Sequence, residues 1–289
     1  MIAITGATGQ LGHQVINNLL ARVPAEQIIA VDLESDRASD LAKLGVEVRF
    51  ADYNKPETLL PAFTGADKVL LVSSPSGPDA SRIAQHQAAI DAAITSGVEL
   101  LAYTSVTHAP TNMMGMAPVH HATEQAIAES GVAAAILRNG WYAENHTGGI
   151  GNALKYGTLL GSAGNGRMAS ASRVDLAEAA AIILTSDDQA GKIYDLTGDT
   201  AWTLSDLAAE ITAQSGKSVA YTDLPPEEYR QALQQVGMPE HVVELVVDAE
   251  VAISRGTLDY VTSDLSTLLG RPTTPMSASV AAALRDLVR

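Results

Sequence analysis

The chain has 289 residues, of which 46% are hydrophobic, and it contains no cysteine. This length suits one large domain or a main domain with a smaller companion. Without cysteine, disulfides, thiolate nucleophiles and cysteine-ligated metals are excluded. Lys and Arg number 18 against 33 Asp and Glu, for a formal net charge of -15, which argues against nucleic acid or an anionic membrane surface as a partner.

The amino terminus shows neither a basic segment nor a small-residue cleavage site after an apolar stretch. No uninterrupted apolar run approaches the roughly 20 residues of a membrane span. We therefore expect a cytoplasmic protein without a membrane partner.

Short apolar runs alternate with helical patterns through the first half of the chain. The expected strands are 2–5, 27–32, 46–50, 68–72, 99–103 and 134–137. The expected helices between them are 10–22, 37–44, 57–63, 80–96 and 120–130. Gly45, Gly65, Gly97 and Gly131 each follow a helix and precede a strand, where a left-handed residue is favoured. This order predicts an α/β fold with a Rossmann-like, doubly wound parallel sheet.

After about residue 140 glycines become frequent and the alternation loosens. A helix from Asp175, a strand over 192–196 and helices over 203–215, 226–236 and 240–255 are expected there. The sequence thus predicts an NAD(P)-binding domain over 1–145, with returning segments at about 167–200. A smaller, mainly helical substrate or cap domain is expected over 146–289.

A glycine-rich turn joins the first strand to the first helix. In Thr5–Gly12, Gly6 allows a tight turn, Gly9 lets the backbone approach a pyrophosphate, and Gly12 lets the helix pack closely on the strand. Free N–H groups at the helix start favour phosphate, so Thr8, Gln10 and Leu11 are candidate cofactor-binding residues together with the glycines. A purely structural turn is the alternative.

Asp32 ends the second strand, twenty positions after Gly12 (32 − 12 = 20). An acid at this distance is placed to accept hydrogen bonds from an adenosine ribose and to repel a 2′-phosphate. Glu34 and Asp36 add negative charge, whereas Arg37 acts the other way if it folds back over the ribose. We therefore expect NADH as the preferred cofactor, with NADPH as the alternative; the other interpretation is a solvated acidic loop.

Polar residues also follow the next strands. Asp52 and Tyr53 lie where a carboxylate meets the adenine amino group, and Ser73 and Ser74 follow the fourth strand at the edge that dinucleotides cross. For these residues the sequence is compatible with two interpretations, contact with the cofactor and a turn without a binding role.

Several segments follow, in order, the pattern of one family. Besides Thr5–Gly12 they are 51–53, 102–105, 120–124, 137–145, 201–204 and 215–217. With these motifs the chain resembles the NmrA-like, atypical branch of the short-chain dehydrogenase/reductases. Within that branch it is most similar to the bacterial NAD(P)H:quinone oxidoreductase 2 type and next to the triphenylmethane reductases.

The resemblance implies a cofactor domain, a smaller carboxyl-terminal domain and a substrate cleft over the nicotinamide. It implies that Asn139, Gly140, Trp141 and Tyr142 border the nicotinamide and the substrate pocket. Thr104, at the end of the fifth expected strand, is a further candidate for cofactor binding. A homodimer is compatible with the family. The chain departs from the NADPH-binding quinone reductases at 31–34, which read Val-Asp-Leu-Glu where those enzymes carry an arginine.

No Tyr-x-x-x-Lys pair occurs, although carbonyl-reducing members of the superfamily use it to pass a proton. His120, at the start of an expected helix, and Ser105, at a strand end, are the catalytic candidates. His121 and Glu124 share a helical face without an apparent third ligand, so we expect neither metal nor flavin.

A quinone accepts hydride readily and needs mainly position and water exclusion. Trp141 and Tyr142 are candidates for a flat wall against an aromatic acceptor, and Met114 for an adaptable apolar lid. The leading hypothesis is an NAD(P)H-dependent reductase of quinone-like small molecules. Reduction of another ketone, an imine or a cationic dye, and a non-catalytic redox-sensing regulator, are the alternatives.

Overall fold

The computed structural model describes residues 1–33, 38–74, 77 and 79–287. Within them the chain divides into two compact units. Unit 1 comprises Met1–Pro110, Pro118–Asn139 and Arg173–Asp195, and unit 2 comprises Thr111–Ala117, Gly140–Ser172 and Leu196–Arg289. Glu34, Asp36 and Arg37, which bear on the cofactor prediction, lie outside the described residues.

A seven-stranded sheet in the order β3-β2-β1-β4-β5-β6-β8 forms the centre of unit 1, which confirms the predicted α/β class with a Rossmann-like parallel sheet. Its strands are β1 (Ile2–Thr5), β2 (Ile28–Asp32), β3 (Glu47–Phe50), β4 (Lys68–Leu71), β5 (Leu100–Val106), β6 (Ala134–Asn139) and β8 (Ile193–Leu196). The strand order reverses between β1 and β4, and dinucleotides bind at the carboxyl ends of strands beside such a switch point.

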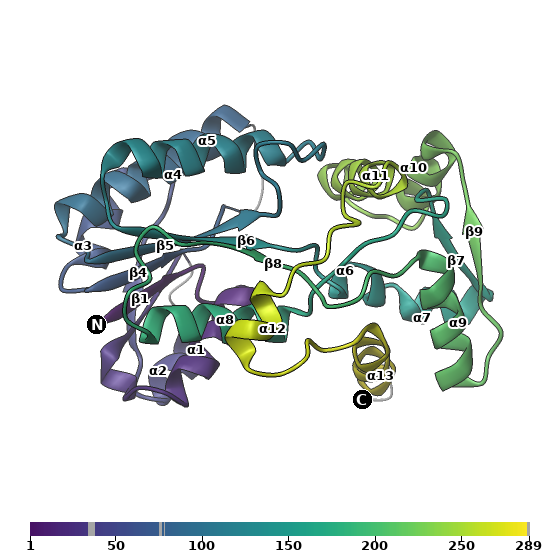
Figure 1. Cartoon of the computed structure of the whole chain (residues 1–289), viewed down its shortest axis with the longest axis horizontal. Coiled ribbons are helices and arrows are strands. Elements are labelled where there is room, and N and C mark those ends of the chain that lie inside the picture. The colour runs from purple at the N-terminus through teal and green to yellow at the C-terminus, as the bar shows by residue number, and fades with distance from the viewer. Residues whose placement is uncertain (34–37, 75–76, 78, 288–289) are drawn as a thin grey trace. The chain divides into compact units, whose positions relative to one another are not determined.

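Helices cover both faces of this sheet. They are α1 (Gln10–Leu20), α2 (Ser39–Lys43), α3 (Leu59–Phe63), α4 (Asp79–Thr95), α5 (Ala117–Ser130) and α8 (Arg173–Thr185), with 3₁₀ turns at Ala25–Gln27 and Pro56–Thr58. Figure 1 shows α3, α4 and α5 on one face and α1, α2 and α8 on the other. Strands β1 and β4 are almost wholly buried because both of their faces are covered.

Two boundaries in unit 1 differ from the prediction in a way that affects the catalytic candidates. Strand β5 continues to Val106, so Thr104 and Ser105 lie inside a fully buried strand rather than at its end. Helix α5 begins at Ala117, so His120 lies one turn inside the helix instead of opening it. Strand β5 is longer because Thr104, Ser105 and Val106 continue the pairing with β6.

Unit 2 contains a two-stranded parallel sheet of β7 (Thr158–Gly161) and β9 (Ala220–Asp223). Its helices are α6 (Glu144–Thr147), α7 (Ile150–Tyr156), α9 (Leu204–Ser215), α10 (Pro226–Gln235), α11 (Glu240–Ser254), α12 (Asp264–Leu269) and α13 (Met276–Asp286). Helix α9 packs on this small sheet and on α13, and α10 pairs with α11. A core of apolar side chains that includes Met168, Trp202 and Ile253 lies between α7, α9, α11 and α13, and a separate cluster of Tyr229, Val243 and Val247 joins α10 to α11.

Candidate functional site

The glycine turn of unit 1 is too tight for side chains. Gly6 has φ +59°, and the Gly9 N–H donates to the Gly6 carbonyl oxygen at 3.0 Å. A Cβ at Gly12 would lie 2.2 Å from that same oxygen. Helix α1 then begins with Gln10, Leu11 and Gly12, and Gly9 offers no side-chain cap to their N–H groups. The turn therefore presents uncapped backbone donors, which is the arrangement that binds phosphate.

Asp32 is tied to this turn. One oxygen of its carboxylate accepts hydrogen bonds from the Thr8 backbone N–H at 2.8 Å and from the Thr8 hydroxyl at 2.9 Å. The acid at the end of β2 thus shapes the turn in addition to any contact with a ribose.

A cavity of about 280 Å³ lies at the carboxyl ends of β1, β2, β3 and β4, and we call it the strand-end cavity. It is lined by Thr5, Gly6, Val31, Asp32, Leu33, Ala51, Asp52, Tyr53, Asn54, Leu59, Ser74 and Gln85. The structure therefore brings five predicted cofactor residues together at one place: Gly6, Asp32, Asp52, Tyr53 and Ser74.

The Ser74 hydroxyl is the most direct sign of a ligand here. It is buried and has no hydrogen-bond partner among the described residues, which is unfavourable unless a bound molecule supplies one. With the glycine turn beside it, the donor and acceptor set fits a nucleotide that carries phosphates. The residues present are thus compatible with the dinucleotide that the sequence predicts.

Side-chain hydroxyls tie the strand ends to one another. The Tyr53 hydroxyl lies 2.7 Å from Thr5 Oγ1 and 2.9 Å from the Val72 carbonyl oxygen. The Val72 N–H donates to Thr5 Oγ1 at 2.8 Å, and the Ser73 N–H donates to Thr104 Oγ1 at 2.9 Å. Burial raises the pKa of Tyr53 well above its usual value, so it stays a neutral donor. Thr5, Tyr53 and Thr104 therefore fix the backbone that borders the cavity.

Asp52 also closes a local turn. Its Oδ1 accepts from the Asn54 N–H at 2.8 Å, while its own N–H donates to Thr58 Oγ1 at 2.9 Å. Since Asp52 lines the strand-end cavity as well, the predicted contact with adenine and the turn interpretation remain compatible with each other.

Two side chains of helix α4 form hydrogen bonds with the loop after β4. The Ser74 N–H donates to His86 Nε2 at 2.9 Å, and Arg82 Nε donates to the Ser74 carbonyl at 3.1 Å. Burial lowers the pKa of His86 to about 4, so its ring is neutral at pH 7. Because Nε2 accepts, the ring proton resides on Nδ1, 2.9 Å from Thr123 Oγ1. His86 thus positions a residue that lines the strand-end cavity.

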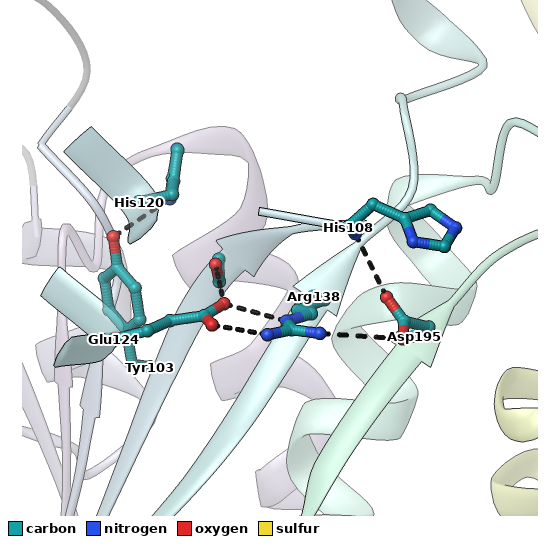
Figure 2. Close-up of polar contacts among 7 residues, drawn as sticks. Tyr103, His108, His120, Glu124, Arg138 and Asp195 are labelled. Atoms are coloured by element: carbon teal, nitrogen blue, oxygen red, sulfur yellow. Dashed lines mark hydrogen bonds and ion pairs between the residues drawn. The ribbon is translucent and has the colours of Figure 1, made fainter. Parts of the chain in front are cut away.

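His120 is placed unfavourably for the predicted proton transfer. It is 2% exposed, and its Nδ1 lies 2.9 Å from the Tyr103 hydroxyl. Burial lowers the pKa of His120 to about 3, so at neutral pH the ring is uncharged and cannot act as an imidazolium acid toward a substrate. The contact with Tyr103 favours a structural role (Figure 2).

Ser105, the other catalytic candidate, donates its hydroxyl proton to Glu124 Oε1 at 2.5 Å. Arg138 donates two hydrogen bonds to the same carboxylate, from Nε to Oε1 at 2.9 Å and from Nη2 to Oε2 at 2.6 Å. A further oxygen, Oδ2 of Asp195, lies 3.9 Å from Arg138 Nη1. Figure 2 shows Glu124, Arg138 and Asp195 of this cluster, which lie on α5, β6 and β8. Ser105 is therefore engaged in a buried ion-pair cluster rather than presented to a substrate.

Replacing Arg138 by Lys is expected to lower the free energy of unfolding by about 1 kcal/mol, since an ammonium cannot make the planar two-bond contact with Glu124. The side chains of Arg138 and Glu124 are only 16% and 9% exposed, so water does not replace the lost bond. Urea denaturation measures the change. Lys43→Gln, at an exposed pair with Asp40, is the control and should leave the free energy of unfolding nearly unchanged. Equal losses in both variants would contradict the structural role of the cluster.

Unit 2 contains a larger cavity of about 500 Å³, which we call the unit-2 cavity. Its lining is mostly apolar: Trp141, Asn145, His146, Gly148, Gly149, Asn152, Ala153, Tyr156, Thr158, Leu159, Leu160, Leu204, Tyr229, Ala232, Leu233, Gln235, Val236, Met238, Val246, Ala249 and Glu250. This volume is in the range of small-molecule sites. Trp141, a predicted substrate residue, lies in this cavity wall, and its indole N–H donates to His146 Nε2 at 3.1 Å, which fixes the ring.

The other residues assigned to the substrate or nicotinamide border line neither of these two cavities. Met114 is buried among the apolar side chains of unit 2, so the expected lid is wrong for this residue; its thioether fills the core. Tyr142 pairs in a β-bridge with Ala171. Gly140 donates its N–H to the Leu196 carbonyl at 2.8 Å, and Asn139 ends β6 with its carbonyl accepting from Thr107.

Two absences concern the described residues only. No group of three or more His, Cys, Asp or Glu side chains there is arranged to hold a metal ion. None of the helices in the described ranges combines the length and the apolar character that a membrane crossing requires.

Comparison with known proteins gives the same picture. The profile of a family described as NAD(P)H-binding matches residues 6–187. Quinone oxidoreductase 2 of Escherichia coli is 45% identical over 280 residues, which cover 97% of each chain. The crystal structure of the NADPH-dependent quinone oxidoreductase of E. coli with NADPH superimposes with a TM-score of 0.94, covering 98% of this chain and 100% of that one. The NADP(H) complex of Citrobacter sp. triphenylmethane reductase gives 0.95 at 38% identity, with coverage of 98% and 100%.

The chain therefore belongs to the NAD(P)H-binding, NmrA-like family of atypical short-chain dehydrogenase/reductases. Within that family it is an enzyme of the NAD(P)H:quinone oxidoreductase type. The expected preference for NADH is not supported, because both of these solved relatives are described with NADPH or NADP(H). The two hydrogen bonds from Thr8 give Asp32 a reason to be present that is independent of the ribose.

Proposed function

We propose that this chain reduces quinone-like acceptors with hydride from NADPH. The observation that carries the proposal is 45% identity over nearly the whole length to a quinone oxidoreductase, together with a strand-end cavity whose orphaned Ser74 hydroxyl and glycine turn fit a dinucleotide. A bound NAD(P)H supplies the hydride. The proposed work of the chain is to bind the cofactor and the acceptor and to exclude water from them.

The proposed cofactor roles follow the strand ends. Gly6, Gly9 and Gly12, with the N–H groups of Gln10 and Leu11, hold the pyrophosphate at the start of α1. Asp32 and Asp52 border the adenosine half, while Ser73 and Ser74 follow the next strand across the switch point. Thr104 holds the Ser73 N–H and thereby positions this loop.

The acceptor is proposed to bind against Trp141 in the unit-2 cavity. Its mostly apolar lining suits a neutral, flat ring, and a net charge of -15 does not repel an uncharged quinone. A quinone needs no dedicated tyrosine acid to accept hydride, which agrees with the missing Tyr-x-x-x-Lys pair. The 38% identity to a triphenylmethane reductase favours a cationic dye as the second acceptor class.

The test follows nicotinamide absorbance with NADPH or NADH against 1,4-benzoquinone, a cationic triphenylmethane dye and a simple ketone. We expect the fastest oxidation with NADPH and quinone. The absence of cysteine removes thiol addition to the quinone as a competing reaction. Faster reaction with NADH would show that Asp32 repels the 2′-phosphate of NADPH as the sequence predicts. Faster reduction of the dye than of the quinone would favour a cationic dye as the acceptor. Cofactor binding without turnover of any acceptor would favour a non-catalytic sensor.

A further inference from the structure

One carboxyl group in the unit-2 cavity is not used by the proposed function. Glu250, on α11, is 2% exposed and lines the cavity beside Tyr229 of α10. Its Oε1 accepts from the Tyr229 hydroxyl at 3.1 Å, and its Oε2 accepts from the Ser162 backbone N–H. A Cβ at Gly161 would lie 2.6 Å from Oε2, so the backbone leaves room for this carboxylate. The local sequence thus accommodates a buried acid inside an apolar pocket.

The two protonation states of Glu250 direct the Tyr229 hydrogen differently. When the carboxylate is ionised, the Tyr229 hydroxyl donates to Oε1. When Oε1 carries a proton, that proton is donated to the tyrosine oxygen, and the hydroxyl hydrogen of Tyr229 turns to another acceptor. Ser162 keeps donating to Oε2 in both states. Because Tyr229 also lines the cavity, its hydrogen then becomes available to a molecule bound there.

We infer that Tyr229 and Glu250 form a proton-controlled hydrogen-bond donor for a carbonyl oxygen of the acceptor bound in the unit-2 cavity. The inference deepens the proposed function and rests on it for the quinone-like ligand. An uncharged ring with carbonyl oxygens fits both the apolar walls and the single donor. Tyr229 and Glu250 select the acceptor and position its carbonyl oxygen.

The surroundings place this change near neutral pH. Burial raises the pKa of Glu250 to about 7, and the negative charge of Asp223 on β9 acts in the same direction. Tyr221 on β9 faces the carboxylate as well, but burial raises its pKa and keeps it neutral. On α6, burial lowers the pKa of His146 to about 4, so this ring is uncharged above pH 5.5. Of Glu250, Tyr221 and His146, Glu250 is the one that changes charge between pH 5.5 and 8.5.

Quenching of tryptophan fluorescence by 2,5-dimethyl-1,4-benzoquinone, without cofactor, measures binding directly because Trp141 lines the cavity. In the unaltered protein we expect the Kd to rise about fivefold from pH 5.5 to 8.5, the size of one modest hydrogen bond. 1,4-Dimethylbenzene, which lacks the carbonyl oxygens, should displace the quinone with a pH-independent Kd.

Two variants separate the donor from its control. Glu250→Gln keeps an acceptor for Ser162 and donates its amide hydrogen to Tyr229, so its Kd should stay at the tight value across the pH range. Tyr229→Phe removes the donor, so its Kd should stay at the weak value. Tyr156→Phe, at an exposed tyrosine of the same cavity, should keep the fivefold change. Melting curves of each variant verify folding.

Several results would overturn the inference: no quenching at any pH, a fivefold change that persists in Glu250→Gln, or tight binding by Tyr229→Phe. Should Glu250→Gln not fold, Tyr229→Phe and 1,4-dimethylbenzene still decide the question. This experiment contains no NADPH, so its outcome is independent of turnover. A pH-dependent Kd with no quinone reduction would overturn the proposed function alone.

Discussion

Asp32→Asn is expected to raise the ratio of kcat/KM with NADPH to kcat/KM with NADH by about 30-fold, which corresponds to about 2 kcal/mol. The carboxylate lines the strand-end cavity at the end of β2, where the adenosine ribose is proposed to bind. A 2′-phosphate there meets a like charge, and removing one charge favours NADPH. Hydrogen bonding to a ribose without phosphate is weakened by the same change, which lowers activity with NADH.

The isosteric amide is chosen because of Thr8. Asn keeps an oxygen that accepts from the Thr8 N–H and hydroxyl, so the glycine turn is preserved. The prediction concerns a ratio and holds whichever dinucleotide the unaltered enzyme prefers. Steady-state kinetics with both cofactors at low ionic strength measure it, because salt screens the effect.

Asp52→Asn is the matched control for this prediction. Asp52 lines the same cavity, but its proposed neighbour is the adenine, which both cofactors share. Its substitution should change both kcat/KM values together and leave their ratio within about threefold. An unchanged ratio in Asp32→Asn, or an equal change in both variants, would place the ribose away from Asp32.

The fold of unit 1 was predictable because its central strands β1, β2 and β4 are buried on both faces and are therefore mostly apolar. Glycines with positive φ, such as Gly97 and Gly131, mark the helix ends that the sequence indicates. The small sheet of unit 2 left no comparable signal. Strands β7 and β9 have four residues each and are largely half-buried or exposed, so they show neither an apolar run nor alternation.

The site was predictable only where backbone conformation or strand position determines it. The glycine turn and the strand-end acids could be located from spacing, since parallel strands end at one edge. Glu250 looks like one more polar residue on an amphipathic helix, because its burial depends on unit 2 packing around it. The ion pair of Arg138 could have been predicted from the sequence. An arginine in the apolar strand AAILRN needs a carboxylate partner nearby, and Glu124 lies on the preceding helix.

Gly12→Ala is expected to raise the Kd for NADPH by more than about 100-fold and to lower the melting temperature. The added Cβ would lie 2.2 Å from the oxygen of Gly6, 2.9 Å from its carbonyl carbon and 3.2 Å from the Cα of Ala7. All three atoms belong to the backbone of the turn, so no side-chain rotation relieves the clash. Helix α1 cannot simply withdraw, because it packs on α8 and buries Leu11, Val15, Ile16 and Leu19. The turn that presents N–H groups to the pyrophosphate must therefore distort.

The sign of the stability change makes this prediction decisive, because Gly→Ala inside a helix is otherwise stabilising by about 1 kcal/mol. Gly151→Ala is the control: it lies within α7, and its Cβ would meet only the methyl groups of Leu287, the nearest at 3.1 Å. The leucine side chain is exposed and can move. Gly151→Ala should leave the Kd for NADPH unchanged and hold or raise the melting temperature, as measured by calorimetric titration and thermal denaturation. Equal behaviour of the two variants would show that close packing of α1 on the turn does not govern cofactor binding.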